Sequence, residues 1–65
     1  SGVVTLKNNT SIEKVILINI LGSVVFESSI NATQANIDMQ YLASGSYILS
    51  IFIDGKSAQH YVLKE

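Results

Sequence analysis

The sequence contains no cysteine, proline, tryptophan or arginine, and two of these absences exclude whole classes of protein. Without cysteine, neither a disulfide framework nor a cysteine-based zinc site can form. Without arginine, and with only four lysines and a net charge of −1, the chain lacks the basic patch typical of nucleic-acid-binding proteins. His60 is the only histidine, which leaves too few ligands for a dedicated metal site. We therefore expect no cofactor and no nucleic-acid partner.

Charged residues are also scarce, yet the sequence contains no segment suited to crossing a membrane. They make up 14% of the chain, against about 25% in typical soluble proteins. The longest apolar run extends from Val15 to Leu21 and is interrupted by Asn19. It falls well short of the ~20 residues that a membrane-spanning helix needs, so we expect no membrane span.

What the sequence has in abundance is β-branched residues. Nine isoleucines and six valines in 65 residues favour strands over helices, because branched side chains pack well on a pleated surface. A chain of this length buries only about 60% of the surface that it exposes when unfolded, so its margin of stability is thin. We expect one small domain over residues 1–65.

Short apolar segments alternate with gaps rich in Asn, Ser and Gly, a pattern typical of all-β domains. The expected strands cover residues 3–6, 14–20, 23–28, 35–39, 46–53 and 56–63. We expect loops at 7–11 and 29–34, since Asn and Ser side chains bond the nearby backbone. Residues 40–44 form a further connection, with Leu42 filling the core. Six strands with mostly short antiparallel connections predict a small β-sandwich.

Side-chain alternation and glycines give the expected faces and turns. Residues 14–20 are apolar on both faces, which predicts a central strand covered on both sides. In the strand 46–53, alternate residues starting at Tyr47 share one face, and in the strand 23–28 Val24 and Phe26 point inward. Gly22 and the pair Asp54-Gly55 predict two hairpin turns, because tight turns require a positive φ.

No group of side chains indicates catalysis. His60 is the only candidate base, and no nucleophile-elbow motif surrounds Ser50 or Ser57. Asp38 and Asp54 resemble turn or strand-end residues rather than paired catalytic carboxylates. The glycines are dispersed, so there is no phosphate-binding loop. We expect that the domain is not an enzyme.

The tyrosines leave a second class of function open. Tyr41, Tyr47 and Tyr61 could stack on sugars, although aromatic residues in strands more often serve core and cross-strand packing. The alternative to the main hypothesis below is therefore a non-catalytic β-sandwich module for adhesion or carbohydrate binding.

Three segments, in order, resemble one known family. The first is residues 12–25, IEKVILINILGSVV, and the second is residues 37–49, IDMQYLASGSYIL. The third is Asp54-Gly55-Lys56 with the terminal strand that follows. The chain resembles the type A C-terminal sorting domain of proteins exported by the type IX secretion system of Bacteroidetes. Each motif is weak alone, and their order and spacing across nearly the whole chain make the match specific.

The resemblance implies a fold and a function. The fold is a small immunoglobulin-like antiparallel β-sandwich of about six to seven strands. The function is that of a folded secretion signal at the end of a larger secreted cargo protein. Such a domain passes through the periplasm, is recognised by the outer-membrane translocon, and is normally removed by a sortase, which leaves the cargo at the cell surface or outside the cell. The expected partners are the translocon, the sortase and the upstream cargo domain.

The resemblance also assigns residues. In the family the final residues matter for export, and these correspond here to Val62, Leu63, Lys64 and Glu65. The motif residues that we expect to determine the fold first, and any recognition second, are Gly22, Asp38, Leu42, Gly45, Tyr47 and Gly55.

The chain departs from the family pattern at its beginning. Members usually start with a strand containing Pro-Asn-Pro, whereas this proline-free chain starts at Ser1-Gly2, so either the first strand is missing or these two residues are not native. Leu17-Ile18 stands where an aromatic residue is common, which is a conservative change. A missing first strand would leave a sheet edge unpaired, and such edges pair with other chains. We therefore expect a homodimer formed by strand exchange.

Overall fold

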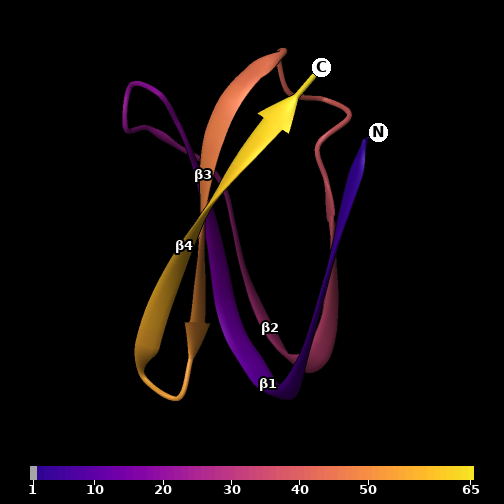
Figure 1. The fold of residues 1–65 in the computed structure, drawn as a ribbon, viewed down its shortest axis with the longest axis vertical. Helices are drawn as coiled ribbons and strands as arrows, with labels where there is room; N and C mark the ends of the chain where they lie inside the picture. Colours follow the sequence, from indigo (N-terminus) through magenta and orange to yellow (C-terminus); the bar gives the residue numbers. More distant parts are fainter. Residues whose placement is uncertain (1) are drawn as a thin grey trace.

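Four antiparallel strands make up the computed structural model, which describes residues 2–65; Ser1 lies outside the described residues. The strands are β1 (Val3–Asn19), β2 (Val24–Asp38), β3 (Gly45–Ile53) and β4 (Lys56–Lys64), as labelled in Figure 1. They form one open sheet in the order β2-β1-β3-β4, with no helix among residues 2–65. The all-β class is confirmed, whereas an immunoglobulin-like sandwich of six to seven strands is not.

The lower strand number arises because two expected loops continue as strands. Residues 7–11 belong to β1 and residues 29–34 to β2, so the prediction of loops there is wrong. The polar residues of these segments lie where the pairing of β1 with β2 is irregular. Register shifts occur between Lys7 and Ile12 and between Ile12 and Lys14. Asn31 adopts a φ of 54°, a left-handed conformation that asparagine tolerates better than most residues. Polar residues therefore mark bulges that bend the strands without ending them.

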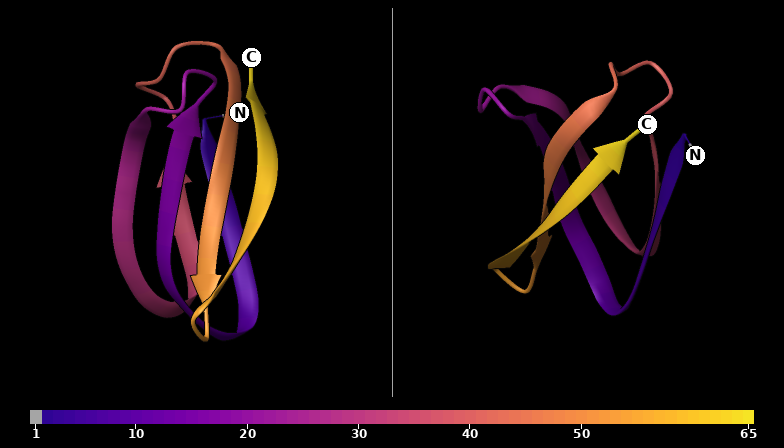
Figure 2. Two further views of the ribbon diagram at one scale, coloured as in Figure 1. Left: turned by 90° about the vertical axis from the view of Figure 1, so that its left-hand side faces the viewer. Right: turned by 45° about the horizontal axis from the view of Figure 1, so that its top comes forward.

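The bends fold the sheet over one of its own faces. Figures 1 and 2 show β1 and β2 both turning sharply, so that the outer half of their hairpin lies across the sheet formed by the inner half with β3 and β4. In the outer half Val3 pairs with Asp38, and in the inner half Lys14 pairs with Ser29. One continuous hairpin thereby contributes to both layers.

The hydrophobic core lies between these layers. Its eight buried side chains are each at most 8% exposed; they are Ile12, Val15, Leu17, Ile37, Met39, Tyr47, Leu49 and Ile51. Burial of an aliphatic side chain of this size stabilises the fold by about 1.5–3 kcal/mol. The expected inward face of β3 is confirmed, and Leu42 packs against the core as expected.

Two expectations about side-chain direction are wrong. β1 is central, but only its inner face is covered: Val15 and Leu17 are buried, whereas Ile16 and Ile18 are half-buried on the outer face. Val24 is 57% exposed instead of pointing inward. A register shift between Leu17 and Ile18 adds one residue to β2, which reverses the alternation, so that Val25 packs against the core in place of Val24.

The two predicted hairpin turns are confirmed. Asp54 and Gly55 both have positive φ, 53° and 73°, as a type I′ turn requires. Gly22 has a φ of 85°, and its N–H donates to the carbonyl of Asn19 at 3.0 Å. The side-chain oxygen of Asn19 also accepts hydrogen bonds from the N–H groups of Leu21 and Ser23, both at 3.0 Å. This turn carries two apolar residues at its tip, Ile20 and Leu21, which are 80% and 84% exposed.

Candidate recognition site

The side chains that could perform chemistry are dispersed. No group of three His, Cys, Asp or Glu residues among residues 2–65 could hold a metal ion. His60 is exposed on β4, and Asp54 lies in the β3–β4 turn. Asp38 uses its Oδ1 to accept a hydrogen bond from the N–H of Gln40 at 2.9 Å, so it serves the turn as the sequence suggested. Over the same residues, no helix has the length and apolarity that crossing a membrane demands.

Four of the six motif residues instead gather around the connection between β2 and β3. Asp38 begins this connection, Leu42 lies within it, and Gly45 ends it with a φ of 150°. Tyr47 donates a hydrogen bond from its hydroxyl to the carbonyl of Ala43 at 2.5 Å while its ring is 6% exposed. The motif therefore specifies how one loop is attached to the core. Gly22 and Gly55 lie in separate turns.

The end of β4 is hydrogen-bonded to the same β2–β3 connection. Lys64 pairs with Gly45 in the sheet, and its Nζ donates a hydrogen bond to the carbonyl of Leu42 at 2.8 Å. Hydrogen bonds to charged groups contribute more than neutral ones, about 1.5–3 kcal/mol. The start of β1 also reaches this end of the molecule, since the N–H of Met39 donates to the carbonyl of Gly2 at 2.6 Å. In Figure 1 the start of β1 and the end of β4 both lie beside the β2–β3 connection.

The four expected recognition residues alternate in direction. Val62 and Lys64 are half-buried, and Val62 packs against the core. Leu63 is 68% exposed and Glu65 is also exposed. Because successive strand residues point to opposite faces, this segment divides into residues that hold β4 in place and residues that a partner can reach.

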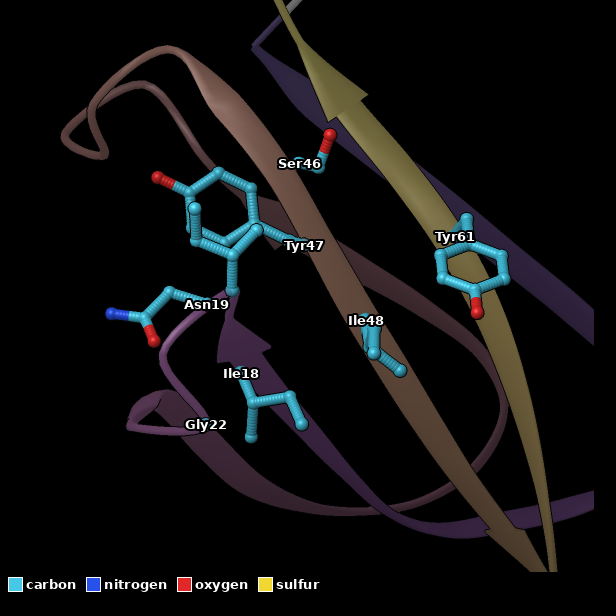
Figure 3. Close-up of a pocket in the computed structure, with 8 residues that line it drawn as sticks. Ile18, Asn19, Gly22, Ser46, Tyr47, Ile48 and Tyr61 are labelled. Carbon is cyan, nitrogen blue, oxygen red and sulfur yellow. The ribbon is translucent and has the colours of Figure 1, made fainter.

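Sequence reasoning missed an apolar depression on the outer face of the sheet. Its volume is about 260 Å³, and Ile18, Ile48 and Tyr61 line it from three neighbouring strands, as Figure 3 shows. The signal was present in the alternation of isoleucines from Ile16 to Ile20. That alternation predicts burial on both faces instead, because strands covered on both sides are apolar throughout.

Comparison with known families identifies the domain. The family described as the secretion system C-terminal sorting domain matches residues 1–65, which is the whole chain. The chain belongs to this family. The resemblance carried by the three motifs is thereby confirmed: this is a sorting domain of type IX secretion. No curated protein and no solved structure matches the chain.

The sorting domain does not bring its tyrosines together into a platform for sugars. Tyr47 points into the core, whereas Tyr61 is 89% exposed on the opposite face of the sheet. Tyr41 is 63% exposed in the β2–β3 connection. Tyr47 and Tyr61 both border the depression of Figure 3, but the Tyr47 side chain is 6% exposed and its hydroxyl donates to the carbonyl of Ala43, so it offers no free ring face for stacking beside Tyr61.

Proposed function

We propose that residues 1–65 form the sorting domain of a larger secreted protein in a bacterium of the Bacteroidetes. The domain acts as a folded secretion signal that the outer-membrane translocon recognises after the cargo has entered the periplasm. A sortase at the cell surface then removes it, leaving the cargo at the surface or outside the cell. The match to the sorting-domain family over the whole chain carries this proposal. The family also suggests a non-catalytic role.

Within the domain, we propose that the translocon recognises the end of β4 and the residue after it, residues 62–65, which we call the recognition segment. Val62 and Lys64 fix this strand by packing against the core and by the hydrogen bond to the carbonyl of Leu42. Leu63 and Glu65 are the residues available to a partner. The hydrogen bond and the core contact support a pre-organised end, which lowers the entropy lost when a partner binds.

A reporter fusion tests the proposed function. The sorting domain is attached to the C-terminal end of a periplasmic reporter protein in a bacterium with a working type IX system. A second fusion also carries, directly before the domain, the Pro-Asn-Pro-containing first strand that family members usually have. We expect the reporter at the cell surface or in the medium, and we expect deletion of residues 62–65 to retain it in the periplasm. A reporter that stays periplasmic with both intact fusions would contradict the proposed function. Unchanged export after the deletion would contradict the role of residues 62–65.

We further propose that the isolated domain forms a homodimer through strand exchange at a free sheet edge. Among residues 2–65, the first half of β1 pairs only with β2, since its pairing with β3 starts at Lys14. A strand added at that edge would bring the fold closer to an immunoglobulin-like sandwich. Light scattering at high micromolar concentration should give the mass of a dimer, and a monomer there would refute this proposal.

A further inference from the structure

The outer face of the sheet is divided into a polar end and an apolar end. At the polar end, Lys14 lies 3.8 Å from a carboxylate oxygen of Glu27, and its Nζ lies 5.0 Å from the centre of the Phe52 ring. Ser50 and Gln59 follow on β3 and β4 in the row that contains Ile16 and Glu27. This end has the polar character expected of the solvated face of an antiparallel sheet.

At the apolar end the same face carries almost no polar side chain. One cross-strand row there contains only large apolar and aromatic side chains, namely Val24, Ile18, Ile48 and Tyr61. Beyond this row lie Ile20 and Leu21 at the tip of the β1–β2 turn, and Leu63 on β4. We call these seven residues the apolar end.

The apolar end is large for a domain of this size. Five of its side chains are more than half exposed: Ile20, Leu21, Val24, Tyr61 and Leu63. Since each exposes on the order of 100 Å², together they present roughly 500 Å², and exposed apolar patches of that size on monomers are often functional. Exposure of this kind costs solubility, so it indicates a surface that a partner covers.

The depression at its centre gives this surface a specific shape. It measures about 260 Å³ and lies between Ile18, Ile48 and Tyr61, whose side chains face the same side of the sheet in Figure 3. Binding energy at protein interfaces is concentrated where an anchoring side chain enters such a pocket. A single aliphatic or aromatic side chain is the ligand suited to an uncharged depression of this volume.

We propose that the apolar end docks a protein component of the outer-membrane export machinery. This inference rests on the proposed function and names the surface and the partner for it. The partner presents an uncharged, apolar protein surface, and one of its aliphatic or aromatic side chains enters the depression. Leu63 belongs both to the apolar end and to the proposed recognition segment, so the two surfaces are continuous and one partner can contact both.

The chemistry of the surface disfavours the other occupants. Amphipathic binding to an anionic lipid surface uses lysine or arginine beside the apolar residues, and none of the seven residues is charged in a chain of net charge −1. A second copy of the domain, packed face to face, would cover Leu63, which is 68% exposed and belongs to the proposed recognition segment that the translocon has to reach.

A double substitution at the most exposed positions tests this inference. The variant Leu21→Ser with Tyr61→Ser removes two side chains that are 84% and 89% exposed, and so should leave the fold intact. The matched control is Gln34→Ser with Gln59→Ser, two exposed residues outside the apolar end. Thermal unfolding of each purified domain reports folding. Should the double variant unfold, the single variant Leu21→Ser is judged by the same criteria.

The reporter fusion then separates the outcomes. We expect the wild-type domain and the control to export the reporter and the apolar-end variant to export at least about tenfold less, equivalent to ~1.4 kcal/mol of binding. If the wild-type fusion is not exported, the proposed function fails. If wild type and variant are exported equally, the proposed function stands and this inference is overturned.

Two further measurements on the purified domain distinguish the occupants. Light scattering detects binding of a second copy of the domain. If the wild type forms a dimer, the double variant is a monomer and both are exported equally, the apolar end binds a second copy and the docking of export machinery is overturned. Co-sedimentation with protein-free vesicles of anionic phospholipid detects a lipid surface. Binding of the wild type to these vesicles, lost in the double variant, would overturn it as well. The inference predicts neither result.

Discussion

At the apolar end of the sheet formed by β1, β3 and β4, both faces carry large apolar and aromatic side chains, but one face is buried and the other is exposed. Leu49 on the inner face is 2% exposed, whereas its neighbour Ile48 on the outer face lies in a solvent-open depression. The folded-over half of the β1–β2 hairpin covers one face and leaves the other uncovered. Apolar residues on the inner face are therefore explained by folding, and those on the outer face require a different explanation.

The largest expected effect separates Leu49 from Ile48. Leu49→Ala creates a cavity in the core and should cost about 2–5 kcal/mol, against a total stability of roughly 3–10 kcal/mol for a chain of this length. Ile48→Ala removes half-buried atoms and should cost about 1 kcal/mol. Urea unfolding measures both values. Equal losses would mean that the outer face is covered in the isolated domain, and the comparison would fail.

A smaller effect is expected for the two tyrosines. Tyr47→Phe removes the hydrogen bond to the carbonyl of Ala43 while keeping the ring in the core, which should cost about 0.5–1.5 kcal/mol. Each kcal/mol corresponds to about 4–8 °C in melting temperature for a small domain. Tyr61→Phe changes a ring that is 89% exposed and should leave the melting temperature unchanged. A loss in both variants would show that Tyr61 also has a structural role.

The prediction from sequence succeeded where side-chain alternation was regular. In β3 the residues alternate without interruption over nine positions, and the register with β4 has no shift, so the inner face starting at Tyr47 followed directly. The turn at Asp54-Gly55 followed for a similar reason, since only a few residue types accept positive φ at two adjacent positions.

The prediction failed where one added residue reverses the alternation. A single-residue shift places Val25 rather than Val24 against the core, and no feature of the sequence marks where this shift occurs. The prediction of loops at residues 7–11 and 29–34 failed because Asn and Ser favour turns locally, whereas the pairs Lys7 with Gln34 and Ile12 with Ala32 carry both strands through the irregular stretch between them.

Of the candidate site, the identities of the residues could be predicted but not their arrangement. The hydrogen bond from Lys64 to the carbonyl of Leu42 joins residues 22 positions apart and depends on the folded sheet. The alternation of the terminal strand already places Val62 and Leu63 on opposite faces, and the register of β4 with β3 shows that the face of Val62 is the inward one.

The smallest stability effects are expected at the end of β4. Val62→Ala removes part of a half-buried side chain that packs on the core and should cost about 1 kcal/mol. Leu63→Ala, one residue further, should cost less than ~0.5 kcal/mol because Leu63 is mostly exposed. Thermal unfolding orders the two variants. The reverse order would contradict the assignment of Val62 to holding the strand and Leu63 to contact with a partner.

Binding of the purified sorting domain to isolated outer membranes tests the central claim most directly. The membranes come from a type IX-competent bacterium and from an isogenic strain without the translocon. The account predicts that the wild-type domain and the Gln34→Ser, Gln59→Ser control co-sediment with the competent membranes only, and that the Leu21→Ser, Tyr61→Ser variant binds neither. Equal binding of the folded variant and the wild type to competent membranes would contradict the claim that the exposed apolar face is the recognition surface.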